Sequence, residues 1–525
     1  MDEVEVSAVF DALSEKIIRL NDCTEADREE AMRSLIRLDR AVDESTQDGI
    51  PRALLRLMLS SVMINIAADA HDVEGLKTGV KWAAQLIDDE ALPWKLRQQG
   101  RYNYANGILE RYQIEEATDT CGHFSQVSDP EFRLKNTEDL RVARTLLSSV
   151  GNDAAVPPPA RSRALCNLGN VLDESGRWVE SYAAYTDSLL ADPSNGNAAG
   201  NIAELLRRRL MIGTGQQGHL AAVYNRYVLL AQVLDEQTVE IAGVGAAERW
   251  RSLELADTEG HLSHTGNTLD PYQQWIVKHR LALVEVVEGL GSDGERWDSA
   301  SVSAVAADST DASVPNIFAA FNVLKAEFLV ARRLAFRGVT MINESELLQH
   351  PDDSGVYTDT LDGGFYGEGT AMLLLAQRSA LDVLDKIAVT ANEHFKSGMN
   401  PAKVGFTKYW MDSKSSDIRP SLTAGDAGRR PILALAELAI DIENGMYSDA
   451  KLLRNAGTHR LVHATFGRPT GPTKETFSSV DITELEKATI SALWVVRAAY
   501  LYLVDLLDSQ APEGGDGLIS IPNQR

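Results

Sequence analysis

The sequence predicts an all-α protein, built as a helical solenoid followed by a helical bundle. Apolar residues recur every three and four positions, as in "SAVFDALSEKIIRL" and "RALLRLMLSSVMINIA", which is the periodicity of amphipathic helices. Stretches with the alternating pattern of strands are scarce. The 525 residues exceed the size at which a single core usually stops growing, so two or more domains are expected.

The composition is that of an ordinary globular chain with an acidic balance. The sequence has 44% hydrophobic residues and a formal net charge of -25. This charge argues against a general nucleic-acid coat or a binder of anionic membranes, because both need a cationic face. The three cysteines lack metal-ligand spacing, and "MDEVEVSAVF" has no secretory pattern. We therefore expect reduced thiols and a cytoplasmic protein.

Residues 1–290 are predicted to form a helical repeat domain. The stretch "SRALCNLGNVLDESGRWVESYAAYTDSLLADP" resembles a tetratricopeptide repeat, and the clearest repeat spans residues 162–195. Small residues such as Gly169 and Ser181 let two helices approach closely, and Pro193 ends the second helix. Ile202 and Ala203 occupy the Leu and Gly positions of a weaker following repeat. We expect the repeats to bind a protein or peptide partner, although an irregular helical domain with one chance match is the alternative.

A second helical domain is predicted after a break in the pattern. Residues 291–315 are rich in Ser, Ala and Asp and are taken as a linker. Residues 316–508 then form the helical domain, and residues 509–525 form a flexible tail. Within this domain, "KATISALWVVRAAYLYLVDLL" is about long enough to span a bilayer, but Arg497 near its middle favours a buried bundle helix. A capping-box pattern from Thr483 to Glu486 marks the start of this helix.

One segment of this acidic chain is locally basic. Between Lys451 and Thr470 there are four Lys or Arg residues and no acid. In "RNAGTH", Arg454 and His459 stand five residues apart, which is about 140° of rotation in an unbroken helix. Their side chains converge only if the helix begins or bends between them, and Gly457 permits this.

The pattern R-x-x-x-x-H, with a polar residue after the arginine, resembles the signature of HEPN domains. The segments "AQRSALDVLDKIAVTANEHFKSGMNPAKVGFTKYW" and "RPILALAELAIDIENGMYSDAKLLRNAGTHR" resemble the HEPN branch that is often fused behind tetratricopeptide repeats. The resemblance covers roughly Asn316 to Leu507. Thr458 departs from it, because an acid is expected before the histidine. The resemblance implies a compact helical bundle, a metal-independent ribonuclease and a homodimer in which two motifs face each other.

This chemistry suits the residues of the motif. His459 would act as general acid or base, because imidazole changes charge near neutral pH. Arg454 would clamp the phosphate with two donors, and Asn455 would orient the histidine or the phosphate. The expected contacts to single-stranded RNA come from nearby cations and a histidine, which are Lys451, Arg460, His463, Lys403 and Lys408.

Two further groups leave alternatives open. Phe406, Tyr409 and Trp410 stand among lysines and either stack on bases or pack a loop onto the bundle. Glu327, Arg332 and Arg333 share a predicted helix. They could support the site through an ion-pair network, bind RNA or form a solvated face.

A metal site or cofactor is not expected. His459 and His463 are four residues apart, but no acid or cysteine nearby supplies a third ligand. The aspartates of "HPDDSGVYTDTLDGGFYGEG" do not have the spacing of a calcium loop, and no phosphate-binding loop motif is present.

The first hypothesis is an endoribonuclease that cuts single-stranded RNA by attack of the 2′-hydroxyl. In this hypothesis the repeat domain gates a toxin or antiviral-defence effector. The alternative is a noncatalytic protein-binding scaffold whose helical bundle only dimerises. A third possibility is a nucleotide-binding regulator that uses the same positive pocket.

Overall fold

The computed structural model spans residues 1–525. It describes all of them except 1–2, 46–48, 120–129, 214, 262–268, 292–293, 309–314, 345–352, 359–362, 413–416, 423–425, 450–460, 468–476, 511–517 and 523–525.

The described residues are mainly helical, which confirms the predicted all-α class. The helices that precede the first strand are α1 (Glu3–Asn21), η1 (Glu25–Asp27), α2 (Arg28–Ser45), α3 (Ile50–Asp69), α4 (Val73–Ile87), α5 (Trp94–Asp119), α6 (Pro130–Lys135), α7 (Thr137–Gly151), α8 (Pro158–Glu174), α9 (Trp178–Ala191), α10 (Gly196–Ile212), α11 (Gln217–Val233), α12 (Asp235–Arg251), α13 (Pro271–His279) and α14 (Gly294–Trp297).

The strands occur in the second half of the chain and are short. The elements from the first strand onward are β1 (Ala304–Asp308), α15 (Asn316–Asn343), β2 (Gly364–Phe365), α16 (Glu368–His394), η2 (Pro401–Lys403), α17 (Phe406–Tyr409), η3 (Pro420–Leu422), α18 (Asp426–Asn444), β3 (Leu461–Thr465), β4 (Phe477–Asp481), α20 (Ile482–Asp508) and β5 (Leu518–Pro522).

The chain divides into two compact units that interleave along the sequence. The first comprises Met1–Ser175, Glu180–Ile202 and Leu230–Ser252, and the second comprises Gly176–Val179, Ala203–Leu229 and Leu253–Arg525. These units are defined by contacts between residues and not by a single cut in the sequence. The domain boundaries expected near residues 290 and 315 stay a prediction.

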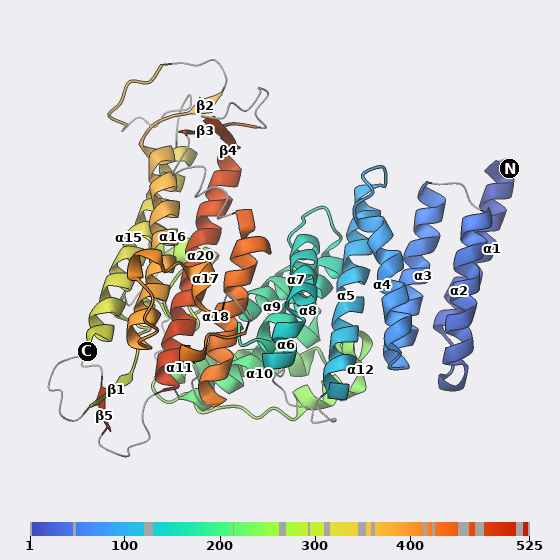
Figure 1. Cartoon of the computed structure of the whole chain (residues 1–525), viewed down its shortest axis with the longest axis horizontal. Helices are drawn as coiled ribbons and strands as arrows, with labels where there is room; N and C mark the ends of the chain where they lie inside the picture. The colour runs from blue at the N-terminus through green and yellow to red at the C-terminus, as the bar shows by residue number, and fades with distance from the viewer. Residues whose placement is uncertain are drawn as a thin grey trace. The chain divides into compact units, whose positions relative to one another are not determined.

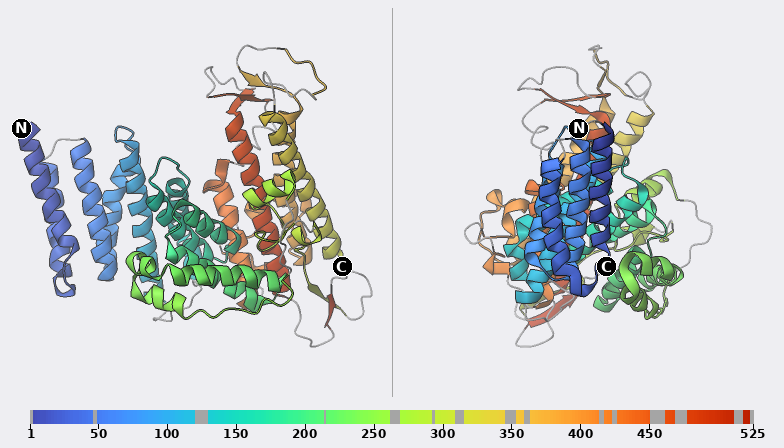
Figure 2. Two further views of the ribbon diagram at one scale, coloured as in Figure 1. Left: turned by 180° about the vertical axis from the view of Figure 1, so that it is seen from behind. Right: turned by 90° about the vertical axis from the view of Figure 1, so that its right-hand side faces the viewer.

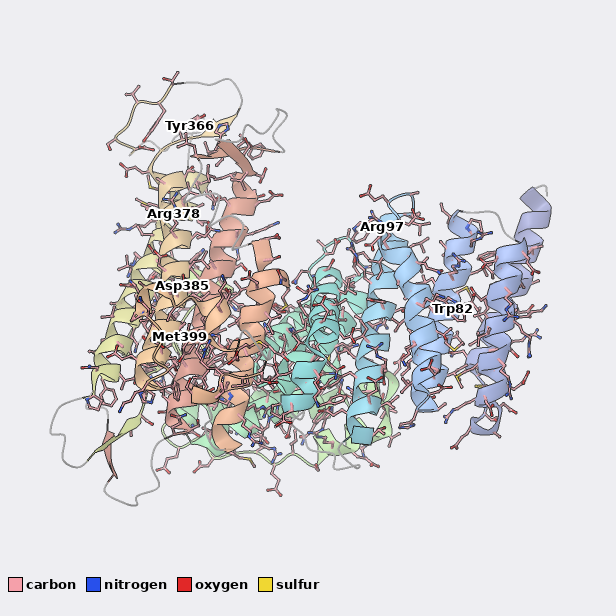
Figure 3. All side chains as sticks on the ribbon, viewed as in Figure 1. Trp82, Arg97, Tyr366, Arg378, Asp385 and Met399 are labelled. Carbon is pink, nitrogen blue, oxygen red and sulfur yellow. The ribbon has the colours of Figure 1, made fainter. Side chains whose placement is uncertain are left out.

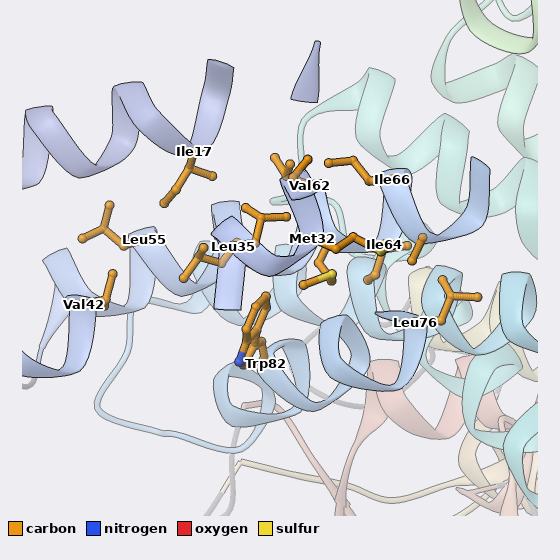
Figure 4. Close-up of a cluster of buried hydrophobic side chains, with 14 of the residues drawn as sticks. Ile17, Met32, Leu35, Val42, Leu55, Val62, Ile64, Ile66, Leu76 and Trp82 are labelled. Atoms are coloured by element: carbon orange, nitrogen blue, oxygen red, sulfur yellow. The ribbon is translucent and has the colours of Figure 1, made fainter. Parts of the chain in front are cut away.

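The first unit stacks its helices in sequence order. From α1 to α5 each helix contacts the next, and α7 then contacts both α5 and α8 (Figure 1, blue to teal). This arrangement is that of a helical solenoid. Figure 4 shows the core at its N-terminal end, where Trp82 of α4 lies beside Met32 and Leu35 of α2. The Trp82 indole donates a hydrogen bond to Asp39, 3.0 Å away, so this large ring is buried with its polar atom satisfied.

The small residues of the repeat pattern meet where α8 and α9 pack together. A Cβ atom on Gly169 would lie 2.4 Å from the ring of Tyr185, so only glycine allows this approach. The Ser181 hydroxyl donates to the Gly169 carbonyl at 2.8 Å. Ser162 and Ser188 join the two helices through their hydroxyls at 2.9 Å. The spacing that resembles a repeat therefore corresponds to a close pair of helices, while the assignment to that repeat family stays a prediction.

The second unit contains a bundle of long helices. Here α16 packs against α15 and α20, and α20 also contacts α15 and α18. Both Figure 1 and Figure 2 show α15, α16 and α20 running alongside one another. The strands form a sheet in the order β2-β3-β4 and a separate antiparallel pair of β1 with β5.

Helix α20 is the centre of this bundle. It is one of two helices among the described residues, with α3, that are long and apolar enough to cross a membrane by length and composition. In α20, 78% of the apolar window is buried inside the structure, which is the position expected for a core helix. Arg497 near its middle donates hydrogen bonds of 2.6 Å to the carbonyls of Ala282 and Val284. The buried charge is therefore solvated by main-chain oxygens.

Two local expectations differ from the structure. Helix α20 begins at Ile482, and its N-cap is Asp481, whose side chain accepts from the Thr483 amide. The capping box predicted Thr483 as the N-cap, which is wrong by two residues because the Asp481 carboxylate accepts from the amide and the hydroxyl of Thr483. Within the segment expected to be a linker, Trp297 and Val302 are buried. Asp298 there pairs with Arg332 of α15, so this segment is packed where it is described.

Candidate functional site

The candidate site lies at the end of the bundle that carries the sheet. Strand β3 is the centre, with β2 antiparallel on one side and β4 parallel on the other. Ala464 of β3 and Val480 of β4 pack with Val339 of α15, Leu373 of α16 and Leu485 of α20. This apolar contact fixes the sheet onto the ends of three helices, as Figure 1 shows.

The predicted catalytic motif falls between α18 and β3. Arg454, Asn455 and His459, with the flanking Lys451 and Arg460, lie outside the described residues. The structure describes the chain up to Asp449 and again from Leu461, the residue directly after Arg460. His463 is the one predicted site residue of this segment that has a described position.

His463 belongs to a row of three aromatic rings beside the sheet. Its Nε2 atom lies 2.9 Å from the Tyr366 hydroxyl, and the two rings are stacked with centroids 5.5 Å apart. The ring of Tyr357 stacks on the ring of Tyr366, with centroids 6.5 Å apart and an interplanar angle of 17°. Figure 3 labels Tyr366 next to β2. We name these three residues the ring row.

The outer member of the ring row is open to solvent. Tyr357 is 42% exposed, whereas His463 and Tyr366 are half-buried. Partial burial and the nearby Asp353 carboxylate raise the pKa of the Tyr357 hydroxyl, so it stays protonated as a hydrogen-bond donor. An exposed aromatic face of this kind can accept a stacked nucleobase.

Asp353 holds the row in place by capping α16. Its carboxylate accepts from the Glu368 amide at 2.8 Å and from the Tyr357 hydroxyl at 3.3 Å. Gly367 has φ of 112°, and a Cβ atom there would lie 2.0 Å from the Asp353 carboxylate. Glycine is therefore required at this turn. Asp353 therefore serves as a helix cap.

The loop that carries Lys403 and Lys408 has exposed lysine side chains and buried aromatic side chains. Lys403 of η2 and Lys408 of α17 are exposed. The side chains of Phe406, Tyr409 and Trp410 are at most 1% exposed, so they pack the loop onto the bundle and cannot stack on bases. Of the two alternatives left open by the sequence, the packing role is the one found.

The loop is also tied to the bundle by its main chain. The Phe406 amide donates to the Asp385 carboxylate of α16 at 2.9 Å, and Figure 3 labels Asp385 within the bundle. Arg419 donates to the carbonyl of Tyr409 at 2.7 Å. These bonds hold Lys403 and Lys408 on a fixed surface.

Glu327 has a partner of its own, whereas Arg332 and Arg333 both contact Tyr272. Glu327 pairs with Lys386 of α16 at 2.6 Å on the surface. Arg332 is buried and makes two 2.8 Å hydrogen bonds to Asp298. The guanidinium of Arg333 lies 4.0 Å from the centre of the Tyr272 ring. Of the alternatives that the sequence left open, a common ion-pair network of these three residues is not found, because Glu327 pairs with Lys386 and Arg332 pairs with Asp298.

Among the residues that the structure describes, no group of three or more His, Cys, Asp or Glu side chains could hold a metal ion. His463 already uses its Nε2 atom in the bond to Tyr366.

Tyr357, Tyr366 and Asp353 were not predicted as site residues. Tyr366 follows a two-residue strand, and Asp353 acts on a helix that begins 15 residues later. Such short elements and long loops carry no periodic signal. The only available indication was the unusual density of Gly, Asp and Tyr in this stretch.

The comparison with known families agrees with this architecture. The family described as LA2681-like HEPN matches residues 309–510. This range contains α15, α16, α18 and α20 as well as the ring row, and it includes the RNAGTH motif. Residues 309–510 are therefore similar to a HEPN domain, which supports the resemblance seen in the sequence. No curated protein and no solved structure matches the chain.

Proposed function

We propose that the HEPN domain is a metal-independent endoribonuclease that cuts single-stranded RNA. The observation that carries this proposal is the position of "RNAGTH" within the matched residues 309–510. HEPN domains are commonly ribonucleases. The segment leads directly into β3, which carries His463 of the ring row. The exposed face of Tyr357 and the exposed Lys403 and Lys408 further support an RNA ligand.

The reaction needs one proton acceptor, one proton donor and a fixed cation. A histidine, His459, takes the proton of the 2′-hydroxyl, and the 2′-oxygen then bonds to the adjacent phosphorus. The bond from phosphorus to the 5′-oxygen breaks, and an imidazolium returns a proton to that oxygen. Arg454 stabilises the charge on the phosphoryl oxygens, and Asn455 orients the phosphate or the histidine. The products are a 2′,3′-cyclic phosphate and a 5′-hydroxyl.

The proposal includes a homodimer and a gate. A two-fold pair of HEPN domains would bring two copies of Arg454 and His459 to one cleft. Lys451, Arg460 and His463 would hold the RNA backbone beside it. The helical unit before the bundle would restrain cleavage until a partner binds, as suits a cytoplasmic toxin or antiviral-defence effector, in which uncontrolled cleavage harms the host.

End-labelled single-stranded RNA, incubated with the full chain in the presence of EDTA, tests this function. We expect cleavage that leaves a 2′,3′-cyclic phosphate and that is lost in His459→Ala and in Arg454→Ala. The matched control is His71→Asn, which changes an exposed histidine of the first unit. Intact RNA with a stable dimer would instead support the scaffold, and cleavage that EDTA abolishes would contradict a metal-independent reaction.

A further inference from the structure

Two histidine rings of the second unit lie side by side with ring nitrogens that have no hydrogen-bond partner. His219, in the first turn of α11, is 3% exposed, and neither of its ring nitrogens has a hydrogen bond to any residue that the structure describes. The ring centre of His261 lies 5.5 Å away, and its Nδ1 atom is also buried and unpartnered. Buried polar atoms without partners lose their hydration and gain nothing in return, so a ligand that bonds to them would stabilise this site.

A third unpartnered donor belongs to the segment that packs against the start of α11. Gln216, directly before the helix, accepts from the Leu220 amide with its carbonyl, and its side chain donates to the carbonyl of Arg296 in α14 at 2.8 Å. This bond holds α14 beside the first turn of α11. The Nη1 atom of Arg296 is buried and has no hydrogen-bond partner among the described residues, and its guanidinium forms no ion pair with them.

A glycine allows the turn that carries His261 to approach α11 this closely. A Cβ atom on Gly218 would lie 2.2 Å from the Glu259 carbonyl and 2.7 Å from the His261 amide nitrogen. The turn itself is closed by a 2.9 Å hydrogen bond from the His261 amide to the Thr258 carbonyl. The two rings are therefore held together by main-chain packing, and their polar atoms are left for another group.

A second glycine leaves space beside the His219 ring. At the position of a Cβ atom built on Gly289, the only atom within 4 Å that belongs to a described residue beyond its chain neighbours is Cε1 of His219, at 3.9 Å. In an imidazole, Cε1 lies between the two nitrogens. An atom in this space would therefore contact the edge of the ring that carries both polar atoms.

The charges around His219 favour an anion over a metal ion. Burial, and then the charges of His261 and Arg296, lower the pKa of His219 to about 4, so near pH 7 its ring is neutral and carries one N–H donor. Arg226 acts in the same direction, and the nearby carbonyl of Val286 opposes it without a hydrogen bond of ordinary geometry. Because arginine is always protonated, a divalent cation is repelled here and an oxyanion is attracted. The positive end of the α11 dipole adds to this preference.

We propose that His219, His261 and Arg296 bind the phosphoryl group of inorganic phosphate or of a small phosphate ester at the N-terminal end of α11. The three donors belong to three separate segments, which are α11, the turn after Thr258 and α14. A tetrahedral phosphoryl group has enough oxygens to accept from all of them, whereas a carboxylate has two. These residues precede the matched range 309–510, so the proposal does not depend on RNA cleavage.

Isothermal titration calorimetry of the full chain in a phosphate-free buffer tests this site, with inorganic phosphate, glycerol 3-phosphate and acetate as separate ligands. We expect phosphate to bind and acetate not to bind. Binding of glycerol 3-phosphate as well would identify the ligand as an ester, and its failure would identify the free ion. Arg296→Gln and His261→Gln should each weaken binding at least about tenfold, because each removes a hydrogen bond to a charged group. His219→Leu should abolish binding, with circular dichroism as a check on folding.

Two control variants separate this site from other cations. Lys278→Gln removes an exposed positive charge of the same unit, and Arg454→Ala alters the RNAGTH motif; both should bind phosphate as the wild type does. Wild-type affinity in Arg296→Gln and His261→Gln would overturn the proposal. So would the absence of phosphate and ester binding at millimolar concentrations, in calorimetry and in the shift of thermal unfolding alike. Zinc binding that is lost in His219→Leu, without phosphate binding, would overturn it in favour of a metal site.

Discussion

The guanidinium of Arg177 lies 2.5 Å from the carboxylate of Asp441, and neither side chain is exposed to solvent. Arg177 precedes α9, whereas Asp441 lies near the end of α18, so the pair joins segments 264 residues apart. Asp441→Asn removes the carboxylate charge that faces this buried cation, and we expect a loss of about 3–5 kcal/mol in the free energy of unfolding of the second unit. Urea titration followed by circular dichroism measures this loss.

The double variant Arg177→Met with Asp441→Leu separates charge from packing. Because both charges are removed together, most of the lost stability should return. Arg19→Ala breaks an exposed pair with Glu15 and should leave the transition unchanged. Equal destabilisation by the single and double variants would show that the interaction between the charges is not the cause.

The buried position of Trp410 gives the second prediction. Trp410→Ala removes a side chain that is 1% exposed and packs against Phe406 and Tyr409. We expect a loss of about 3–5 kcal/mol in unfolding free energy and no change in RNA affinity of the folded protein. Thermal unfolding and RNA binding below the transition provide the two measurements. A selective loss of RNA binding at full stability would restore the base-stacking interpretation.

How much of the structure could be predicted from the sequence depends on how far apart along the chain the interacting residues lie. Local periodicity was enough to predict the helices, and small residues at fixed spacing predicted the close approach of two helices that the structure shows at Gly169. The sequence could not decide whether Trp410 is buried, because exposed and packed aromatic side chains occur in the same local sequence pattern. The contacts Arg332–Asp298 and Tyr366–His463 join distant segments through loops and short strands, which have no repeating signal.

The third prediction concerns two exposed lysines and their effect on RNA binding. Replacing both Lys403 and Lys408 by Gln should weaken RNA binding and flatten its dependence on salt. If each lysine contacts one phosphate, the slope of log affinity against log salt should fall by about 0.7 for each residue. Fluorescence anisotropy with a labelled single strand at several salt concentrations measures the slope. Lys77→Gln, in the first unit, serves as the control, and an unchanged slope in the double variant would remove these lysines from the RNA path.

Stability of the second unit should depend on a buried histidine. Burial and the neighbouring His261 lower the pKa of His219 to about 4, and Arg296 and Arg226 act in the same direction. Because this value is below the usual 6.5, protonation favours the unfolded chain. The contribution of His219 is complete above about pH 6.5 and is lost as the pH falls toward 4, with a slope of about 1.4 kcal/mol per pH unit.

His219→Leu should reduce that slope by about the same amount. Unfolding free energies from about pH 4.5 to about pH 7.5 measure it. His71→Asn is the comparison, because this histidine is exposed and lies in the first unit. An identical slope in wild type and His219→Leu would mean that His219 titrates alike in the folded and unfolded chains.

The last prediction concerns the bond between Tyr366 and His463. Tyr366→Phe keeps the stacked ring but removes the hydroxyl that lies 2.9 Å from His463 Nε2, whereas Tyr366→Ala removes both contacts. If the ring row positions RNA beside the motif, Tyr366→Ala should raise KM for RNA about tenfold or more, because stacking contributes about 1–3 kcal/mol per base. Tyr366→Phe should retain KM, since it keeps the stacked ring and removes only one hydrogen bond to His463. Steady-state cleavage across pH, with circular dichroism as a check on folding, distinguishes the two variants. If the two variants have equal kinetics, the ring row takes no part in substrate binding. The role of His459 is then a separate question.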